Sequence, residues 1–243
     1  MNKDLRFLFL LFPIFLIPSL KAQVYDGANA NIVIEGAEKI RYTSRSTYPN
    51  YISFQQLQSP QDGEIVSFIQ AILQLQVEDG LVLMGTEYDE LGYMHLRFQQ
   101  TYADKKVEAG QYIVHYKLGQ GIESFNGDYF ALDNMPENAS LSEESALQAA
   151  LDHIQAETYK WEIEGEAEAV LGHVSPESES HSLYPKGELV YVPVGGDYDE
   201  QDFRLAYKFD IYAHEPMSRS FTYVDANNGS VLWQHQRIHT ADT

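Results

Sequence analysis

Apolar and polar residues alternate strictly from Tyr93 onward, and this pattern constrains the fold more than any other feature of the chain. Met94, Leu96 and Phe98 occupy every second position, and tyrosine, histidine, arginine and glutamine fill the positions between them. Successive side chains of a β-strand point to opposite faces, so this period predicts a strand with one buried and one polar face. Such a strand requires partner strands and a layer that covers its apolar side.

Partner strands are predicted directly after it. Residues 103–106, with the sequence ADKK, turn the chain, and residues 111–118 form a second strand rich in β-branched and aromatic residues. Residues 122–127 form a short third strand that ends at the turn-forming pair Asn126-Gly127. Together these strands predict an antiparallel meander.

The covering layer is predicted to be a helix that starts at Ser59. Ser59 suits the N-cap, and Pro60 suits the first helical position because the N–H group that it lacks would have no helical partner there. The apolar residues that follow at helical spacing are Ile65, Phe68, Ile69, Ile72 and Leu73. Residues 23–58 mix polar and turn-forming residues, so we expect them to be a loosely attached extension.

A second helix is predicted where the period changes near residue 140. Ser140 with Glu143 would form a capping box, although Ser142 is a competing N-cap. The apolar positions of this helix are Leu147, Ala150, Leu151 and Ile154. An acidic, serine-rich loop follows, and three strand-like runs then close the chain, the last bent into a hairpin at Asn228-Gly229. The loop and the runs are at 172–187, 188–194, 204–213 and 220–236.

The sequence therefore predicts an α+β fold of two small modules, each a helix packed on an antiparallel sheet. We place the modules at 59–132 and 138–238, because Pro136 and Asn138 interrupt both periodicities. With 44% apolar residues the chain can bury a core, so disorder throughout is not expected.

Residues 1–22 have the layout of a signal peptide, with Lys3 and Arg6 ahead of a short apolar run and the small Ala22 at the end. The run is too short to span a bilayer. The chain contains no cysteine, which excludes a disulfide framework and a thiolate metal site. Its net charge of -20 would repel phosphate backbones. We expect a secreted protein that binds neither nucleic acid nor, after removal of the signal, a membrane.

Acidic residues are concentrated between Asp133 and Asp202. This segment contains 17 Asp or Glu, and its only Lys or Arg residues are Lys160 and Lys186. A partner with a basic surface would fit this segment. We favour the simpler explanation, a solvated acidic face that keeps an exported protein soluble.

The stretch HEPMS, at 214–218, is the nearest approach to a zinc-binding His-Glu-x-x-His motif. Its fifth position is Ser218, and Pro216 is unsuited to a helix interior. We therefore predict a turn between two strands there.

The pair His95 and Arg97 would suit anion binding or acid–base chemistry, and His115 on the next strand adds a second imidazole. No third ligand is evident, and side chains on a polar sheet face more often bond neighbouring strands. Asp225 precedes the sequence ANNG and is predicted to bond the backbone of its own turn. We predict no catalytic residue, cofactor or metal ligand in this chain.

The stretch DELGYMHLRFQQTYADKKVEAGQYIVHY resembles the fungalysin/thermolysin propeptide (FTP) domain. That pattern has an Asp and a Gly ahead of His-x-Arg-x-x-Gln-x-Tyr, then a turn, a Val and a strand with a second His. The matching residues are Asp89, Gly92, His95, Arg97, Gln100, Tyr102, Val107 and His115. The chain departs from the pattern at ADKK, where the family usually has a Gly in the turn.

Residues 138–238 resemble the PepSY-type domain that follows FTP in precursors of thermolysin-like metalloproteases. Its closing hairpin, Tyr-Val-Asp-Ala-x-x-Gly-x-Val, is matched by Tyr223, Val224, Asp225, Ala226, Gly229 and Val231. The acidic stretch SPESESHS is an insertion relative to that pattern. Residues 239–243 would then be the junction toward a catalytic domain that is missing from this chain.

The resemblance implies a propeptide that acts as intramolecular chaperone and inhibitor of a thermolysin-like zinc metalloprotease, its partner in cis or in trans. Zinc, and calcium with it, are expected only in the catalytic domain. Under this hypothesis four motif residues form a strand-bridging network that shapes a docking module: His95, Arg97, Gln100 and Tyr102.

Two alternatives belong to other classes. The first is a free-standing secreted binding module or trans-acting protease inhibitor. The second is an autonomous metalloenzyme that uses His95, His115 and His214.

Overall fold

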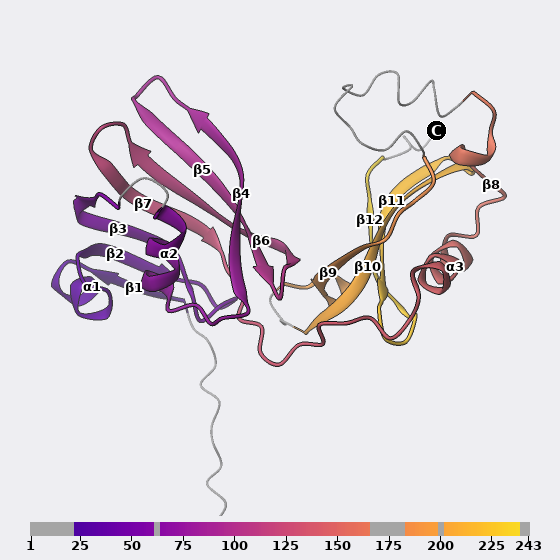
Figure 1. Cartoon of the computed structure of the whole chain (residues 1–243), viewed down its shortest axis with the longest axis horizontal. Helices are drawn as coiled ribbons and strands as arrows, with labels where there is room; N and C mark the ends of the chain where they lie inside the picture. The colour runs from indigo at the N-terminus through magenta and orange to yellow at the C-terminus, as the bar shows by residue number, and fades with distance from the viewer. Residues whose placement is uncertain (1–21, 61–63, 166–182, 199–201, 239–243) are drawn as a thin grey trace, which may run out of the picture.

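The computed structural model describes residues 22–60, 64–165, 183–198 and 202–238, and strands dominate it (Figure 1). The predicted signal peptide and most of the serine-rich loop lie outside these residues. The elements are β1 (Gln23–Asp26), α1 (Ala28–Val33), β2 (Ala37–Tyr42), β3 (Pro49–Gln58), α2 (Ile65–Leu73), β4 (Asp79–Tyr88), β5 (Tyr93–Tyr102), β6 (Lys105–Lys117), β7 (Gly121–Asp128), α3 (Glu143–Ile154), β8 (Thr158–Tyr159), η1 (Lys160–Glu162), β9 (Glu188–Pro193), η2 (Val194–Gly196), β10 (Phe203–Glu215), β11 (Ser218–Asp225) and β12 (Val231–Gln236).

All of these strands belong to one sheet, in the order β1-β2-β3-β7-β6-β9-β10-β11-β12, with β5 and β4 branching from β6 and β8 pairing with β10. The two halves of the sheet are joined by β6 and β9, which run parallel and pair only through Lys106↔Val190 and Val107↔Tyr191. The α+β character is confirmed, but the division into two separate modules is not, because a single sheet runs through both halves (Figure 1).

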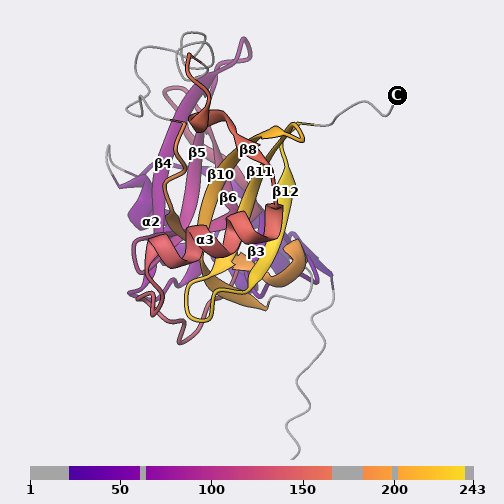
Figure 2. The same ribbon diagram turned by 90° about the vertical axis from the view of Figure 1, so that its right-hand side faces the viewer.

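Two large clusters of buried side chains lie on either side of this joint. The first core contains α2 and the strands β2 to β7, with Ile52, Ile69 and Phe98 among its buried residues. The second core lies under α3, which crosses the strands β10 to β12 (Figure 2). It also takes in Tyr102 and Val107 from the β5–β6 hairpin. The tip of that hairpin therefore packs with the second half of the chain.

Residues 23–58 are an integral part of the sheet, so the expectation of a loosely attached extension is wrong. They form β1, α1, β2 and β3, and β3 pairs with β7. Ile52 and Phe54 are buried in the first core, and the hydroxyl of Tyr112 donates to the carbonyl oxygen of Pro49. The alternation around Ile52 and Phe54 is itself a strand signal. The turn-forming residues before it obscured that signal.

The helix α2 begins at Ile65, later than predicted, with Glu64 at the N-cap. Ser59 does not cap it; its hydroxyl donates to the backbone oxygen of Gln120 (2.9 Å), because β3 has just ended beside the β6–β7 turn. The predicted apolar face is confirmed, since Ile69 and Leu73 are buried.

The helix α3 is capped by Ser142, whose hydroxyl accepts from the backbone N–H of Ser145 (3.2 Å). The alternative capping box with Ser140 is wrong, because Ser140 bonds the C-terminal hairpin: its hydroxyl contacts the side chain of Asn227 and its N–H donates to Ala226. None of the described helices is long and apolar enough to cross a membrane.

The predicted turns have different outcomes. Ala103 and Asp104 form the β5–β6 turn, both with positive φ (44° and 61°), the conformation of a two-residue type I′ hairpin turn. Within the stretch 214–218, Pro216 and Met217 form the turn between β10 and β11, and the hairpin β11–β12 turns around Asn228-Gly229, both as predicted.

The predicted turn at Asn126-Gly127 is wrong, because both residues lie inside β7 and pair with β6. A Cβ at position 127 would lie 2.9 Å from the Cα of Tyr112. Because glycine has no side chain, the backbone of β6 can lie this close to position 127.

Candidate functional site

Four side chains form a line of hydrogen bonds across the outer face of β5, β6 and β7, which we call the histidine chain: Asp89, His95, His115 and Asn126. The ring Nε2 of His95 lies 3.1 Å from Oδ2 of Asp89, and its Nδ1 lies 2.8 Å from Nδ1 of His115. The Nε2 of His115 lies 2.5 Å from Oδ1 of Asn126. His95 and His115 are direct cross-strand neighbours in the ladder. The expected bridging of strands by His95 is therefore present.

Asp89 organises the turn between β4 and β5. Its carboxylate accepts from the N–H groups of Leu91 and Tyr93, both at 2.9 Å. The bond from Tyr93 is the main cause that lowers the pKa of Asp89, and the His95 ring and the Leu91 N–H act in the same direction. Gly92 adopts a positive φ of 85° in this turn, which a side chain would disfavour. Asp89 and Gly92 thus position the first member of the histidine chain.

The residues at the two ends of the histidine chain, Asp89 and Asn126, determine which ring nitrogens carry protons. Asp89 can only accept, so Nε2 of His95 donates; a neutral His95 then accepts at Nδ1, and His115 must donate there. With both histidines neutral, His115 accepts at Nε2 and requires the amide NH2 of Asn126, whereas an Asn126 oxygen at that place requires one of the two histidines to be doubly protonated. The orientation of the Asn126 amide is therefore coupled to the charge of the histidine pair.

Gln100 and Tyr102 lie on the opposite face of β5 from His95 and Arg97, because odd and even positions of a strand point apart. Gln100 is fully buried and bonds Phe130, and Tyr102 is buried against Tyr191 with ring centroids 5.4 Å apart. Arg97 is exposed, and its side chain makes no hydrogen bond or ion pair with the described part of the chain. The structure does not bring these four residues into one network.

Gln99 is a buried residue of the site that the sequence analysis missed. Its amide nitrogen lies within hydrogen-bonding distance of the carbonyl oxygens of Val107 (2.8 Å), Gly110 (2.8 Å) and Gln100 (3.0 Å). These contacts hold residues 107–110, where the register between β5 and β6 shifts. The doubled glutamine in HLRFQQTY is the only local signal for this role.

The C-terminal motif residues make hydrogen bonds and packing contacts within the chain. Asp225 accepts from the N–H groups of Asn227 (2.8 Å) and Asn228 (3.2 Å), as predicted, and Gly229 has a positive φ of 79°. Tyr223 is buried and stacks on Trp233. These residues close the β11–β12 hairpin.

His214 lies on β10, in the other half of the sheet from the two histidines of β5 and β6. Among the described residues, no three His, Asp or Glu side chains are grouped closely enough to hold a metal ion. The metalloenzyme alternative would need His95, His115 and His214 together, and the structure does not assemble them.

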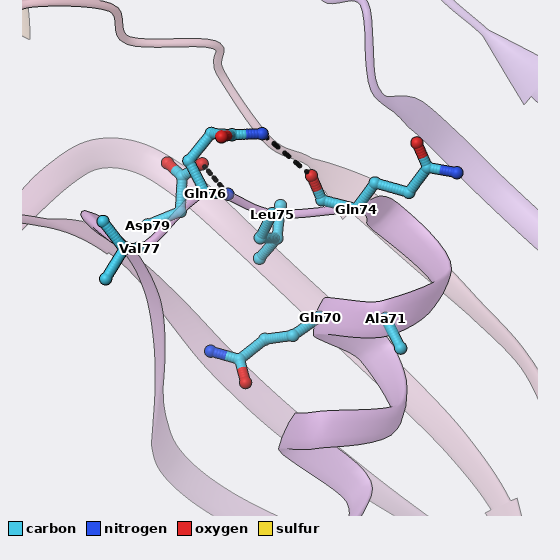
Figure 3. A pocket seen from close by; sticks show the side chains of 7 residues that line it. All are labelled: Gln70, Ala71, Gln74, Leu75, Gln76, Val77 and Asp79. Atoms are coloured by element: carbon cyan, nitrogen blue, oxygen red, sulfur yellow. Dashed lines mark hydrogen bonds between the residues drawn. The ribbon is translucent and has the colours of Figure 1, made fainter.

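A shallow surface pocket of about 610 Å³ lies at the end of α2 (Figure 3). Its lining consists of three glutamines and four other residues: Gln70, Gln74 and Gln76, with Ala71, Leu75, Val77 and Asp79. Asp79 accepts from the N–H of Gln76 (3.1 Å), and burial raises its pKa. This carboxylate ties the end of the helix to the start of β4.

Comparison with known proteins finds one protein family that matches part of the described chain. Residues 79–129 match the family described as Fungalysin/Thermolysin Propeptide Motif, a range that runs from the start of β4 to just past the end of β7. No curated protein matches the chain. Four solved chains match, among them the "Bacillus megaterium YpeB C-terminal domain", at 12% identity and a TM-score of 0.35 over 84% of this chain and 78% of that one. The β4–β7 meander thus carries the motif of these propeptides, a non-catalytic part of protease precursors.

Proposed function

We propose that this chain is the propeptide part of a thermolysin-like zinc metalloprotease precursor, and that it assists folding of the catalytic domain and inhibits it. The observation that carries the proposal is the match of residues 79–129 to the propeptide motif. The matched stretch coincides with a complete structural unit, the β4–β7 meander, whose apolar side is buried in the first core.

The surroundings of the motif residues favour a docking role over a catalytic one. Asp89, His95 and His115 bond one another along the histidine chain. Gln100 and Tyr102 are buried. Groups that are already bonded or buried within the chain fix the shape of the sheet. The exposed surface of the sheet is then what remains for a partner.

A preformed sheet surface suits both proposed activities. A large protease domain that folds slowly benefits from a complementary template, and the same contact covers the active-site cleft until the propeptide is removed. An interface of ordinary size, about 1,600 Å², is sufficient for both.

The remaining features extend this proposal. Residues 1–22 direct secretion, residues 138–238 act as a PepSY-type second part of the propeptide, and residues 239–243 lead toward the catalytic domain. Zinc and calcium belong to that domain, and the propeptide itself binds neither.

The test uses the mature chain and the catalytic domain of the same precursor as separate proteins. We expect the chain to raise the yield of active protease on refolding and to lower peptidase activity, whereas an unrelated acidic protein of similar charge does neither. If refolding yield and activity are both unchanged, the proposal is wrong. Calorimetric titration of the chain with zinc tests the metal expectation separately.

Among the described strands β4 pairs only with β5, and its residues from Val82 to Tyr88 are exposed. This exposed edge favours a second candidate, a free-standing secreted binding module or trans-acting inhibitor. Genomic sequence beyond Thr243 distinguishes the two. An in-frame zinc-binding helix supports the precursor, and a stop codon supports the free-standing module.

A further inference from the structure

The strand β4 forms a free edge of the sheet. It pairs with β5 along one side, and no other described strand pairs with it (Figure 1). Half of the backbone N–H and C=O groups of an edge strand point away from its single partner. β4 therefore presents a row of hydrogen-bonding groups for another extended chain.

The exposed side chains along this edge are unusually apolar. Every residue from Val82 to Tyr88 is exposed. Val82, Leu83 and Met84 are about half exposed (50–54%), and Tyr88 is 68% exposed. Leu91, in the following turn, is 81% exposed. An edge of this kind is a site for pairing with another polypeptide unless the sequence protects it.

The usual protection is largely missing from β4. Natural proteins guard edge strands with lysine, proline or irregular pairing. The sequence has no Lys or Arg between Arg45 and Arg97, and no Pro between Pro60 and Pro136. One irregularity is present, at Met84, where the register to β5 shifts by a residue. It leaves regular pairing on both sides, at 79–83 and 85–88.

The charges on β4 itself and in the residues that flank it along the chain are all acidic, and the cation Arg97 lies one strand further in, on β5 opposite Gly85. Glu87 lies on β4, Asp89 and Glu90 follow in the turn, and Glu78 precedes the strand. A second copy of the chain would bring the same acidic groups and a net charge of -20 to the contact, so self-association is disfavoured. An incoming strand with lysine or arginine complements this edge.

We propose that β4 binds an extended segment of a partner polypeptide, in which apolar residues alternate with lysine or arginine, as an added strand of the sheet. Backbone hydrogen bonds hold the segment in register. Leu83, opposite the buried Phe98, contacts its apolar residues on the core face, and Glu87, opposite His95, pairs with its basic residues on the other face. The proposal goes beyond the propeptide function, because β4 accepts such a segment whichever protein carries it.

The test uses the mature chain and a synthetic peptide as long as β4, in which valine alternates with lysine; a second peptide has glutamate in place of lysine. Binding is measured by calorimetry and located by amide hydrogen exchange. We expect the lysine peptide to bind and to slow exchange in β4, and the glutamate peptide not to bind.

Two matched variants separate strand addition from general attraction of charges. Leu83→Lys places a charge on the edge, and Leu118→Lys places the same charge in the β6–β7 turn, at a residue of nearly equal exposure (50% and 47%). We expect Leu83→Lys to weaken binding at least about tenfold more than Leu118→Lys. Thr86→Lys, also exposed on β4, repeats the test if Leu83→Lys lowers the circular dichroism of the sheet.

Equal losses in the two variants, or exchange protection outside β4, would overturn the proposal. A peptide-free dimer in sedimentation, broken by Leu83→Lys, would also overturn it, since a second copy would then occupy the edge. Protease inhibition by the chain without protection of β4 leaves the propeptide function intact and rejects only the edge proposal. Peptide binding at β4 without protease inhibition supports the edge proposal and rejects the propeptide function.

Discussion

The side-chain amide of Gln100 bonds both backbone polar groups of Phe130. Its nitrogen donates to the carbonyl oxygen at 2.6 Å, and its oxygen accepts from the N–H at 2.9 Å. Phe98 belongs to the first core and Tyr102 to the second, so Gln100 lies where the two cores meet. One buried side chain thus fixes the course of the chain just after β7.

Replacing Gln100 with leucine is expected to destabilise the fold by about 3 kcal/mol. The variant keeps most of the volume but leaves the N–H and C=O of Phe130 buried without partners, and each such group costs about 1–3 kcal/mol. Urea denaturation measures the difference in the free energy of unfolding. Gln120→Leu is the matched control, because Gln120 is exposed. Equal effects of the two substitutions would contradict the assigned role.

Gly110→Ala should destabilise the protein by about 1–3 kcal/mol, because a Cβ at position 110 would lie 2.8 Å from the Cβ of Gln100. Gly85→Ala, on β4, is the control, since a Cβ there would meet no atom within 4 Å. Thermal unfolding of both variants checks this. A Gly110→Ala protein as stable as the Gly85→Ala protein would show that the packing around Gln100 is looser than described.

Lys208 and Glu108 connect β10 with β6 through an ion pair of 2.7 Å, with only 17% and 18% of the two side chains exposed. A double-mutant cycle with Lys208→Met and Glu108→Gln should give a coupling energy of about 1–2 kcal/mol. The exposed pair Lys39 and Asp26 should give less than about 0.5 kcal/mol in the same experiment. The reverse ranking would mean that the β6–β10 pair gains nothing from its burial.

The stabilising effect of Asp89 should depend on pH in a defined direction. Its pKa in the folded chain lies below the ordinary value of 3.8, chiefly because the N–H of Tyr93 donates to the carboxylate. A carboxyl with a lowered folded-state pKa stabilises the fold above its unfolded-state pKa, and the effect is lost as the pH falls through the folded-state value.

We therefore expect Asp89→Asn to be less stable than the wild type at pH 7, and the difference to shrink below about pH 4. Denaturation with guanidinium at several pH values measures it. Glu38→Gln, at an exposed position of β2, should give a difference that changes little over the same range. A constant Asp89→Asn difference would reject the assigned bonds.

Local periodicity predicted the elements that are determined by residues close together in the sequence. The alternation around Leu96 and Phe98 predicted β5, and helical spacing predicted the buried faces of α2 and α3. The Asp225 turn was predicted because its hydrogen bonds reach only two and three residues along the chain.

The parts that were missed depend on contacts between distant residues. Asn126-Gly127 has turn-forming composition, yet it lies inside β7 because Gly127 admits the backbone of β6. The parallel pairing of Val107 with Tyr191 joins residues far apart in the chain, which local pattern does not report. The chain of bonds from His95 to Asn126 likewise depends on the register of three strands, and only the cross-strand neighbours reveal it.

Tyr102 and Val107, at the tip of the β5–β6 hairpin, have a consequence for how the protein can change over evolution. Both precede the linker between β7 and α3, but their side chains are buried with the second half. Recombination at that linker would deliver a C-terminal half with two interior positions empty. Separation of the two halves at that linker would therefore cost the C-terminal half part of its core.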